Sequence, residues 1–207
     1  MKVLLINGSP KENGTTYTAL SEVAEVLKNE EIETEIIHLG KGIVRDCIGC
    51  GGCAGKGKCV FSDDKVNEII EKAEKADGIV VGTPVYYAHS NGRVLSSLNR
   101  MFYAGKSAFT HKVAAAVAVA RRGGTTSAID EINKHFMFNQ MPIASSTYWN
   151  IAYGSNAEDV KKDEEGMQTM RNLGRNIAWL LKCIKSGEEN GISKPVSETG
   201  NRTNFIR

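Results

Sequence analysis

The sequence predicts an α/β fold, a doubly wound parallel sheet with helices on both faces. Five short apolar runs alternate along the chain with five amphipathic stretches. Apolar runs of this length, bounded by Gly, Pro and polar residues, are typical of buried parallel strands. Their alternation with helices requires crossover connections that cover both faces of the sheet. The length of 207 residues favours one domain with elaborations over two domains.

The apolar runs locate the expected strands. The first run, VLLI, is apolar throughout, and the fourth, VAAAVAVA, consists of small apolar and β-branched residues only. In chain order, strands are expected at residues 3–6, 33–39, 78–83, 113–120 and 143–148.

Apolar positions at helical spacing locate the expected helices. In the first helix Leu20, Val23 and Leu27 lie on one stripe, while Glu22 and Glu25 lie outside it. In chain order, helices are expected at residues 15–29, 65–75, 92–102, 127–138 and 165–185. A polar tail, residues 186–207, follows the last helix.

Composition narrows the class of protein. Charged residues make up 24% of the chain and the net charge is +2, which indicates neither disorder nor a nucleic-acid-binding surface. Met1 and Lys2 lead directly into the first strand, so we expect no signal peptide, and no apolar run has the length of a membrane span. We therefore expect a cytoplasmic protein whose five cysteines are thiols, metal ligands or redox groups rather than disulfides.

Three loops of unusual composition follow strands of the expected sheet. They comprise residues 8–16, 84–91 and 121–126. In doubly wound sheets, ligands bind outside the carboxyl ends of the strands. The three loops therefore mark the expected ligand site.

The first loop has the character of an anion site. It is polar, contains Gly8 and Gly14, and leads into the positive end of a helix. It matches neither the dinucleotide pattern G-x-G-x-x-G nor the P-loop pattern G-x-x-x-x-G-K-[ST]. Its hydroxyl groups suit a single terminal phosphate, as in a mononucleotide.

The second and third loops complete a site for a flavin mononucleotide. Pro84, Tyr86 and Tyr87 offer flat apolar surfaces for a planar ring. The third loop offers positive charge and, at its glycines, close backbone N–H groups; its candidate residues are Arg121, Arg122, Gly123 and Gly124.

More ordinary interpretations of these loops stay open. Tyr86 and Tyr87 are also compatible with surface aromatics, and one of two adjacent arginines is expected to be solvated. His38, in the second strand, and His89, in the second loop, are expected to be packed or polar residues rather than a ligand and a proton donor.

Four of the five cysteines form a compact motif. Cys47, Cys50, Cys53 and Cys59 follow the spacing C-x2-C-x2-C-x5-C in a glycine-rich segment. This density suits a [4Fe–4S] cluster, whereas structural zinc sites usually combine two separated C-x2-C knuckles. A cluster-free loop and a zinc site stay open as alternatives. Cys183, in the last helix, is expected to be a buried small hydrophobe.

Four motifs together identify a family resemblance. They are GSPK at residues 8–11, NGTT at 13–16, TPVYY at 83–87 and STYWN at 146–150. The chain resembles, over residues 2–181, the flavodoxin-like NADPH-dependent FMN reductase family, and its cysteine loop is similar to that of the iron–sulfur flavoproteins within it. The resemblance implies FMN bound by the phosphate-loop residues Ser9, Lys11, Asn13, Thr15 and Thr16 and by the ring contacts Pro84, Val85, Tyr86 and Tyr87. The loop compositions add Gly14, Arg122, Gly123 and Gly124 as candidate FMN-binding residues.

The resemblance also implies the organisation of the chain. We expect a flavodoxin-like five-stranded parallel sheet of order 2-1-3-4-5 in residues 1–185, with a cysteine-rich insertion at 40–63. Family members are commonly dimers or tetramers, so a homodimer or homotetramer is expected. The tail 186–207 is expected to pack on a neighbouring subunit.

The leading functional hypothesis is an FMN-dependent oxidoreductase. It would pass electrons between a reduced donor, NAD(P)H or ferredoxin, and an acceptor, by way of a [4Fe–4S] cluster. Flavin N5 does the chemistry, so no catalytic side chain is assigned. One alternative is a cluster-free NAD(P)H-dependent FMN or quinone reductase. A second is a flavodoxin-like electron carrier without substrate turnover, against which the charge of +2 argues, because such carriers tend to be acidic.

Overall fold

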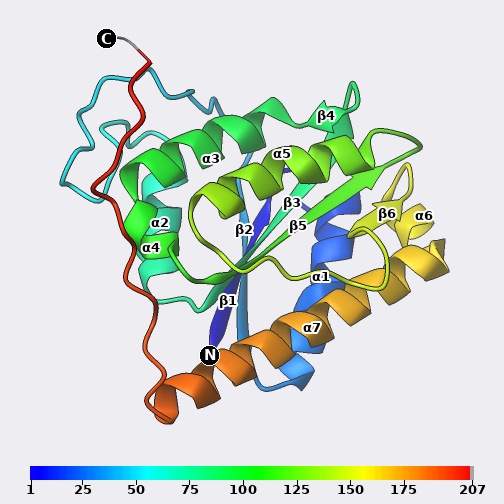
Figure 1. Ribbon diagram of the computed structural model, residues 1–207. Coiled ribbons are helices and arrows are strands. Elements are labelled where there is room, and N and C mark those ends of the chain that lie inside the picture. Colours follow the sequence, from blue (N-terminus) through cyan, green and yellow to red (C-terminus); the bar gives the residue numbers. More distant parts are fainter. Residues whose placement is uncertain (206–207) are drawn as a thin grey trace.

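Five parallel strands form the central sheet of the computed structural model, which describes residues 1–205 (Figure 1). They lie in the order β2-β1-β3-β5-β6, which confirms the expected order of five parallel strands. A sixth, short strand pairs antiparallel with the end of β3. The strands are β1 (Lys2–Asn7), β2 (Glu33–His38), β3 (Gly78–Tyr86), β4 (His89–Ser90), β5 (Val113–Ala120) and β6 (Ile151–Tyr153).

Helices cover both faces of the sheet, as expected (Figure 1). One layer consists of α1 (Thr15–Asn29), α6 (Ala157–Lys162) and α7 (Glu164–Glu189). The opposite layer consists of α2 (Val66–Glu74), α3 (Gly92–Ala104), α4 (Lys106–Phe109) and α5 (Thr125–Phe138).

The strand β5 is apolar throughout because it lies between two helical layers. Along β5, alternate side chains enter opposite cores. Ala114, Ala116 and Ala118 lie on the α5 side. The residues on the α7 side are Val113, Ala115, Val117 and Val119. All eight residues of β5 are buried. The small alanines let the α5 layer approach the sheet closely.

The fifth parallel strand differs from its predicted position. Ile143 makes a single parallel bridge to Ala114, and the regular strand β6 begins only at Ile151, paired with Ala118. Between these two pairings the chain advances by four residues on β5, from Ala114 to Ala118, but by eight residues from Ile143 to Ile151. The difference arises because residues 144–150 leave the sheet. Side-chain hydrogen bonds tie this excursion to α7, among them Ser146 Oγ to the carbonyl of Thr169 at 2.7 Å.

The last helix carries two further differences. It continues to Glu189, four residues beyond the predicted end, and Cys183 on it is exposed rather than buried. None of the helices within residues 1–205 is long and apolar enough to cross a membrane.

Candidate functional site

The first loop leaves the carboxyl end of β1 in close contact with β3. The backbone N–H of Gly8 donates to the carbonyl of Gly82 at 2.9 Å. A Cβ at Gly8 would lie 2.0 Å from Cγ2 of Val94, so only glycine fits. Glycine at this position therefore lets the loop pass close to α3 and β3 where β1 ends.

Local hydrogen bonds give the first loop a fixed shape. The side chain of Asn7 accepts from the N–H of Ser9 and donates to the carbonyl of Glu12. Ser9 Oγ accepts from the N–H of Lys11 at 3.1 Å. His38 Nε2 donates to the carbonyl of Ser9 at 2.8 Å, so this histidine supports the loop from β2.

The N-terminus of α1 has free hydrogen-bonding capacity. Gly14 is the N-cap, and no side chain within residues 1–205 caps the helix. The hydroxyl of Thr16, in the first turn, is buried and has no partner among the described residues. An orphaned hydroxyl beside uncapped N–H groups and a positive helix end is what a phosphate would satisfy.

The second loop is a tight β-hairpin rather than an irregular loop. β3 continues to Tyr86, and β4 returns antiparallel from His89, with Tyr86 paired to His89. The two turn residues, Tyr87 and Ala88, have φ values of +49° and +64°, the left-handed conformation of a type I′ turn, in which residues other than Gly, Asn and Asp are strained. Tyr87 is 101% exposed and Tyr86 is 49% exposed.

A carboxylate on α5 holds the hairpin. Glu131 accepts from the backbone N–H of Ser90 at 2.8 Å and contacts Nδ1 of His89 at 2.6 Å. Burial acts to raise the pKa of Glu131, but the hydrogen bonds from Ser90 and His89 outweigh it and lower the pKa below its ordinary value. His89 is thus part of the anchor of the hairpin.

The third loop touches the second. Gly124 has φ +93° and a Cβ there would lie 2.5 Å from Cα of Ala88, so the loop packs on the hairpin turn only because it has a glycine there. Arg121 and Arg122 are exposed, and a Cβ at Gly123 would meet nothing within 4 Å. The three loops thus lie along one edge of the sheet, which we call the loop edge.

The cysteine segment has no regular secondary structure. Between β2 and α2, residues 39–65 contain no helix or strand. Gly49 and Gly51, on either side of Cys50, have φ values of +63° and +67°, a conformation that glycine adopts without strain.

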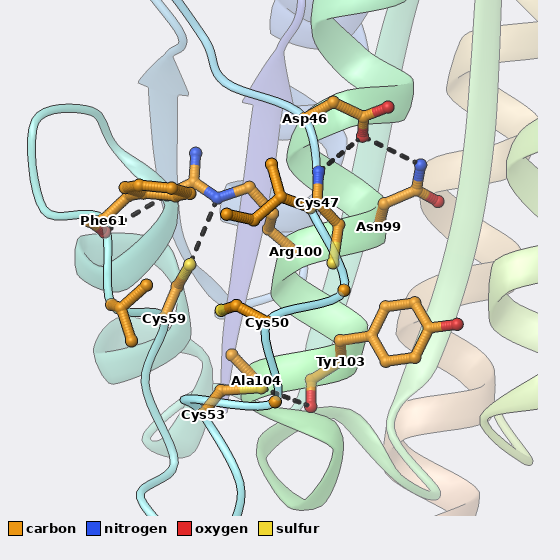
Figure 2. A pocket seen from close by; sticks show the side chains of 14 residues that line it. Asp46, Cys47, Cys50, Cys53, Cys59, Phe61, Asn99, Arg100, Tyr103 and Ala104 are labelled. Atoms are coloured by element: carbon orange, nitrogen blue, oxygen red, sulfur yellow. Dashed lines mark hydrogen bonds between the residues drawn. The ribbon is translucent and has the colours of Figure 1, made fainter.

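The four motif cysteines line one cavity of about 460 Å³ against α3, called here the cysteine cavity (Figure 2). All five cysteines of the chain are free thiols. Within the described part of the chain, no three Cys, His, Asp or Glu side chains converge closely enough to hold a metal ion. The donor set nonetheless matches a four-iron cluster in kind, because such a cluster takes four thiolates around its periphery rather than at one point.

A buried arginine lies between the cysteine segment and α3. Arg100 is 1% exposed, and its Nε donates to Sγ of Cys59 at 3.3 Å. It forms a buried ion pair with Asp64. Burial opposes the charge of Arg100, but hydrogen bonds to Asp64 and Cys59 outweigh this effect and raise its pKa above the ordinary value.

Other side chains of α3 hold the remainder of the segment. Arg93 donates to the carbonyl of Gly42, and Asn99 donates to Asp46, which also accepts from the N–H of Cys47. The cysteine segment is therefore attached to the core by side chains, at several points along one helix (Figure 2).

The sequence did not identify His38, Glu131, Arg100 or Asp64 as contributors to these sites. His38 and Glu131 act on partners 29 and 41 residues away, a relation that local patterning does not reveal. Arg100 follows the polar Asn99 on an amphipathic helix, where an arginine is usually solvated. No signal in the sequence distinguishes it from a surface residue.

Comparison with known proteins identifies a family and a group within it. The profile of the family described as NADPH-dependent FMN reductase matches residues 1–156. The chain is 36% identical to an iron–sulfur flavoprotein of Methanocaldococcus jannaschii, over 89% of this chain and 100% of that protein. It is 32% identical to an iron–sulfur flavoprotein of Archaeoglobus fulgidus, over 91% of this chain and 100% of that protein.

Solved structures agree on the fold. A flavodoxin from the domain Archaea superposes with a TM-score of 0.60 at 14% identity, covering 88% of this chain and 99% of that chain. At this identity the likeness concerns the architecture alone.

Proposed function

The chain belongs to the NADPH-dependent FMN reductase family, and we propose that it passes electrons between FMN at the loop edge and a [4Fe–4S] cluster in the cysteine cavity. The family makes it a flavin-dependent oxidoreductase. The observation that carries the finer proposal is the gathering of all four motif cysteines around one cavity.

The loop edge supports the FMN half of the proposal. The unpartnered hydroxyl of Thr16 and the uncapped start of α1 would hold the phosphate, with Ser9, Lys11, Asn13, Gly14 and Thr15 in the same loop. The strained, exposed hairpin would place Pro84, Val85, Tyr86 and Tyr87 along the ring. Strain that the surrounding structure maintains is typical of functional sites. The adjoining residues Arg122, Gly123 and Gly124 would complete the site.

The cysteine cavity supports the cluster half. Cys47, Cys50, Cys53 and Cys59 are free thiols in a segment that glycines make adaptable, and two relatives of nearly full coverage are iron–sulfur flavoproteins. When bound, FMN exchanges one or two electrons and an iron–sulfur cluster exchanges one, so the pair can convert between the two regimes. The side chains of this protein orient the two groups and tune their environments.

The helix α3 joins the two sites. It begins directly after β4 of the hairpin, and its later residues Asn99, Arg100 and Tyr103 line the cysteine cavity. Arg100 lies eight residues from the start of the helix, about 12 Å along its axis. Both proposed groups would thus lie beside one rigid element.

One observation favours a second candidate, the cluster-free NAD(P)H-dependent FMN or quinone reductase. The cysteines as placed do not converge on a metal ion within residues 1–205. In that case the cysteine segment would serve as a structural or thiol-redox loop, and the loop edge would carry the whole activity.

The identities of partners belong to the proposal as well. NAD(P)H or a reduced ferredoxin would be the donor, in a reducing compartment such as the cytoplasm that keeps five thiols free. A homodimer or homotetramer would give the exposed tail a neighbouring subunit to pack on; Val196 in the tail is 98% exposed.

The test is a visible spectrum of protein purified without oxygen, with iron and acid-labile sulfide assayed on the same sample. We expect flavin bands with a broad shoulder and about four irons per chain. Flavin without iron would replace the cluster proposal by the cluster-free reductase. Steady-state oxidation of NADH or NADPH by the same sample then separates a reductase from a pure carrier, which would show none without a separate reductase.

A further inference from the structure

The guanidinium of Arg100 donates four hydrogen bonds to groups around Cys59. Nε donates to the sulfur of Cys59, Nη1 to Asp64 and to the carbonyl of Arg45 at 3.2 Å, and Nη2 to the carbonyl of Phe61 at 3.2 Å. Its Cζ also lies 5.4 Å from the centroid of the Phe61 ring. All three nitrogens are used, which only the planar fork of arginine permits.

These contacts connect both ends of the cysteine segment. Arg45 precedes the first cysteine, whereas Phe61 and Asp64 follow the last one. One side chain on α3 therefore closes the segment into a loop and fixes the position of one sulfur. Figure 2 shows Arg100 between Phe61 and Cys59 at the wall of the cavity.

Burying a charge at this position is costly unless it is compensated. A simple structural link could be made by neutral groups, so a charged donor directed at sulfur calls for a chemical reason. Reduction adds negative charge to an iron–sulfur cluster, and hydrogen bonds and positive charge at a ligand sulfur stabilise the reduced form.

We propose that Arg100 is a positioning residue that fixes Cys59 and, through its charge, raises the reduction potential of the cluster, an inference that rests on the proposed function. Asp64 has the opposite effect, because its carboxylate offsets the charge of Arg100. The reduction potential of the cluster thus depends on the balance between the charges of Arg100 and Asp64.

A second arginine provides a matched control. Arg45 lies over the same Phe61 ring, at 5.3 Å, and pairs with Asp63 at 3.0 Å. This pair is half exposed, and among residues 1–205 the hydrogen bonds that involve a sulfur join other residues. Solvent screens such pairs, so removing the charge of Arg45 should leave the cluster unchanged.

The experiment is a redox titration of the anaerobically purified holoprotein, followed by the electron paramagnetic resonance of the reduced cluster. We expect the midpoint potential to fall in Arg100→Gln and to rise in Asp64→Asn. Arg100→Lys keeps the positive charge but lacks the planar guanidinium group. The midpoint potential of the cluster in this variant should lie between those of wild type and Arg100→Gln. Arg45→Gln should match wild type.

Opposite shifts of the midpoint potential in Arg100→Gln and Asp64→Asn, at equal iron content, would show that the pair tunes the reduction potential of the cluster and does not serve a purely structural role. A structural role would lower the iron content in both variants and leave the potential of the remaining cluster unchanged. If Arg100→Gln does not hold iron, the double variant Arg100→Gln/Asp64→Asn is compared with Asp64→Asn, and a lower potential in the double variant supports the proposal.

Two results overturn the proposal in different ways. Iron-loaded variants with unmoved potentials, or with shifts of one sign, overturn it alone. Wild-type protein that binds flavin but no iron after reconstitution overturns it together with the cluster half of the proposed function.

Discussion

The loop edge and the cysteine cavity are built by different physical means. At the loop edge, backbone groups of regular elements define the geometry: Gly8 and Gly124 sit where a Cβ would collide with the core or the hairpin. At the cysteine cavity, a segment without helix or strand is held by side chains of α3. The geometry of the loop edge therefore follows from the fold of the backbone, whereas the geometry of the cysteine cavity depends on a few side-chain contacts.

This difference has a consequence for stability. Disturbing the loop edge also disturbs the sheet, because its residues pack on β3 and α3. Most of the cysteine segment lies outside the two apolar cores: Leu39, at its start, belongs to one of them, and Cys53 and Cys59 pack partly against the same core. We therefore expect that substitutions in the cysteine segment can abolish cluster binding without unfolding the domain.

The largest expected effect separates the two regions completely. Cys59→Ser should remove the cluster, because a four-iron cluster requires its thiolate ligands, while FMN binding at the loop edge is retained. The measurement is iron per chain, expected to fall from about four toward zero, alongside flavin content, expected to stay constant.

The exposed Cys183 on α7 serves as the control, since it lies on the opposite helical layer from the cavity. Cys183→Ser should keep both iron and flavin. Full iron content in Cys59→Ser would remove Cys59 from the ligand set.

A second variant tests the loop edge alone. Thr16→Val removes the unpartnered buried hydroxyl at the start of α1 and keeps the side-chain shape. If this hydroxyl binds the phosphate, the dissociation constant for FMN should rise by about 10- to 100-fold, the equivalent of about 1.5–3 kcal/mol for a hydrogen bond to a charged group.

Ser21 gives a matched control because its hydroxyl is also buried and has no hydrogen-bond partner in the described part of the chain, but it lies further along α1. Ser21→Ala should leave FMN affinity unchanged, as measured by fluorescence titration of the apoprotein. Equal affinities for wild type and Thr16→Val would remove Thr16 from the phosphate site.

The sequence was more informative about the loop edge than about the cavity. Four of five parallel strands and all five long helices were placed within a few residues, because burial between two helical layers imposes a continuous apolar pattern. The fifth strand was misplaced since Ile143, Thr147 and Tyr148 are residue types that favour strands, although residues 144–150 leave the sheet. Hydrogen bonds to α7 decide that excursion, and they follow from the tertiary structure.

The arrangement of side chains around the cavity could not be predicted from the sequence. Spacing alone placed four cysteines in one segment, and the structure places them around one cavity. That Arg100 is buried, and that it reaches Cys59 across 41 residues, depends on how α3 packs against the segment. The same limit applies to Glu131 and the hairpin, where the expected loop proved to be a strained turn.

A pair of glycines tests how far the hairpin depends on the third loop. Gly124→Ala places a Cβ against Ala88 at a φ of +93° and should cost about 1–3 kcal/mol of the free energy of unfolding. Gly123→Ala, where a Cβ meets nothing within 4 Å, should change stability by less than about 0.5 kcal/mol. Urea unfolding measures both, and equal stabilities would show that the hairpin and the third loop move independently.

The smallest expected effect concerns the hold of α5 on the hairpin. Glu131→Gln weakens the hydrogen bonds to Ser90 and His89 and should cost about 1 kcal/mol at neutral pH. The pKa of Glu131 is lowered in the folded state, so its contribution is complete above the ordinary value of 4.5 and is lost as the pH falls through the folded-state pKa. The stability difference between wild type and Glu131→Gln should therefore shrink in acid, whereas Asp130→Asn, at an exposed neighbouring position, should stay close to wild type. Because Glu131 is not among the residues that line the cysteine cavity, iron content should be the same in all three proteins. A parallel loss of iron in Glu131→Gln would show that α3 transmits the state of the hairpin to the cavity and that the two regions are coupled.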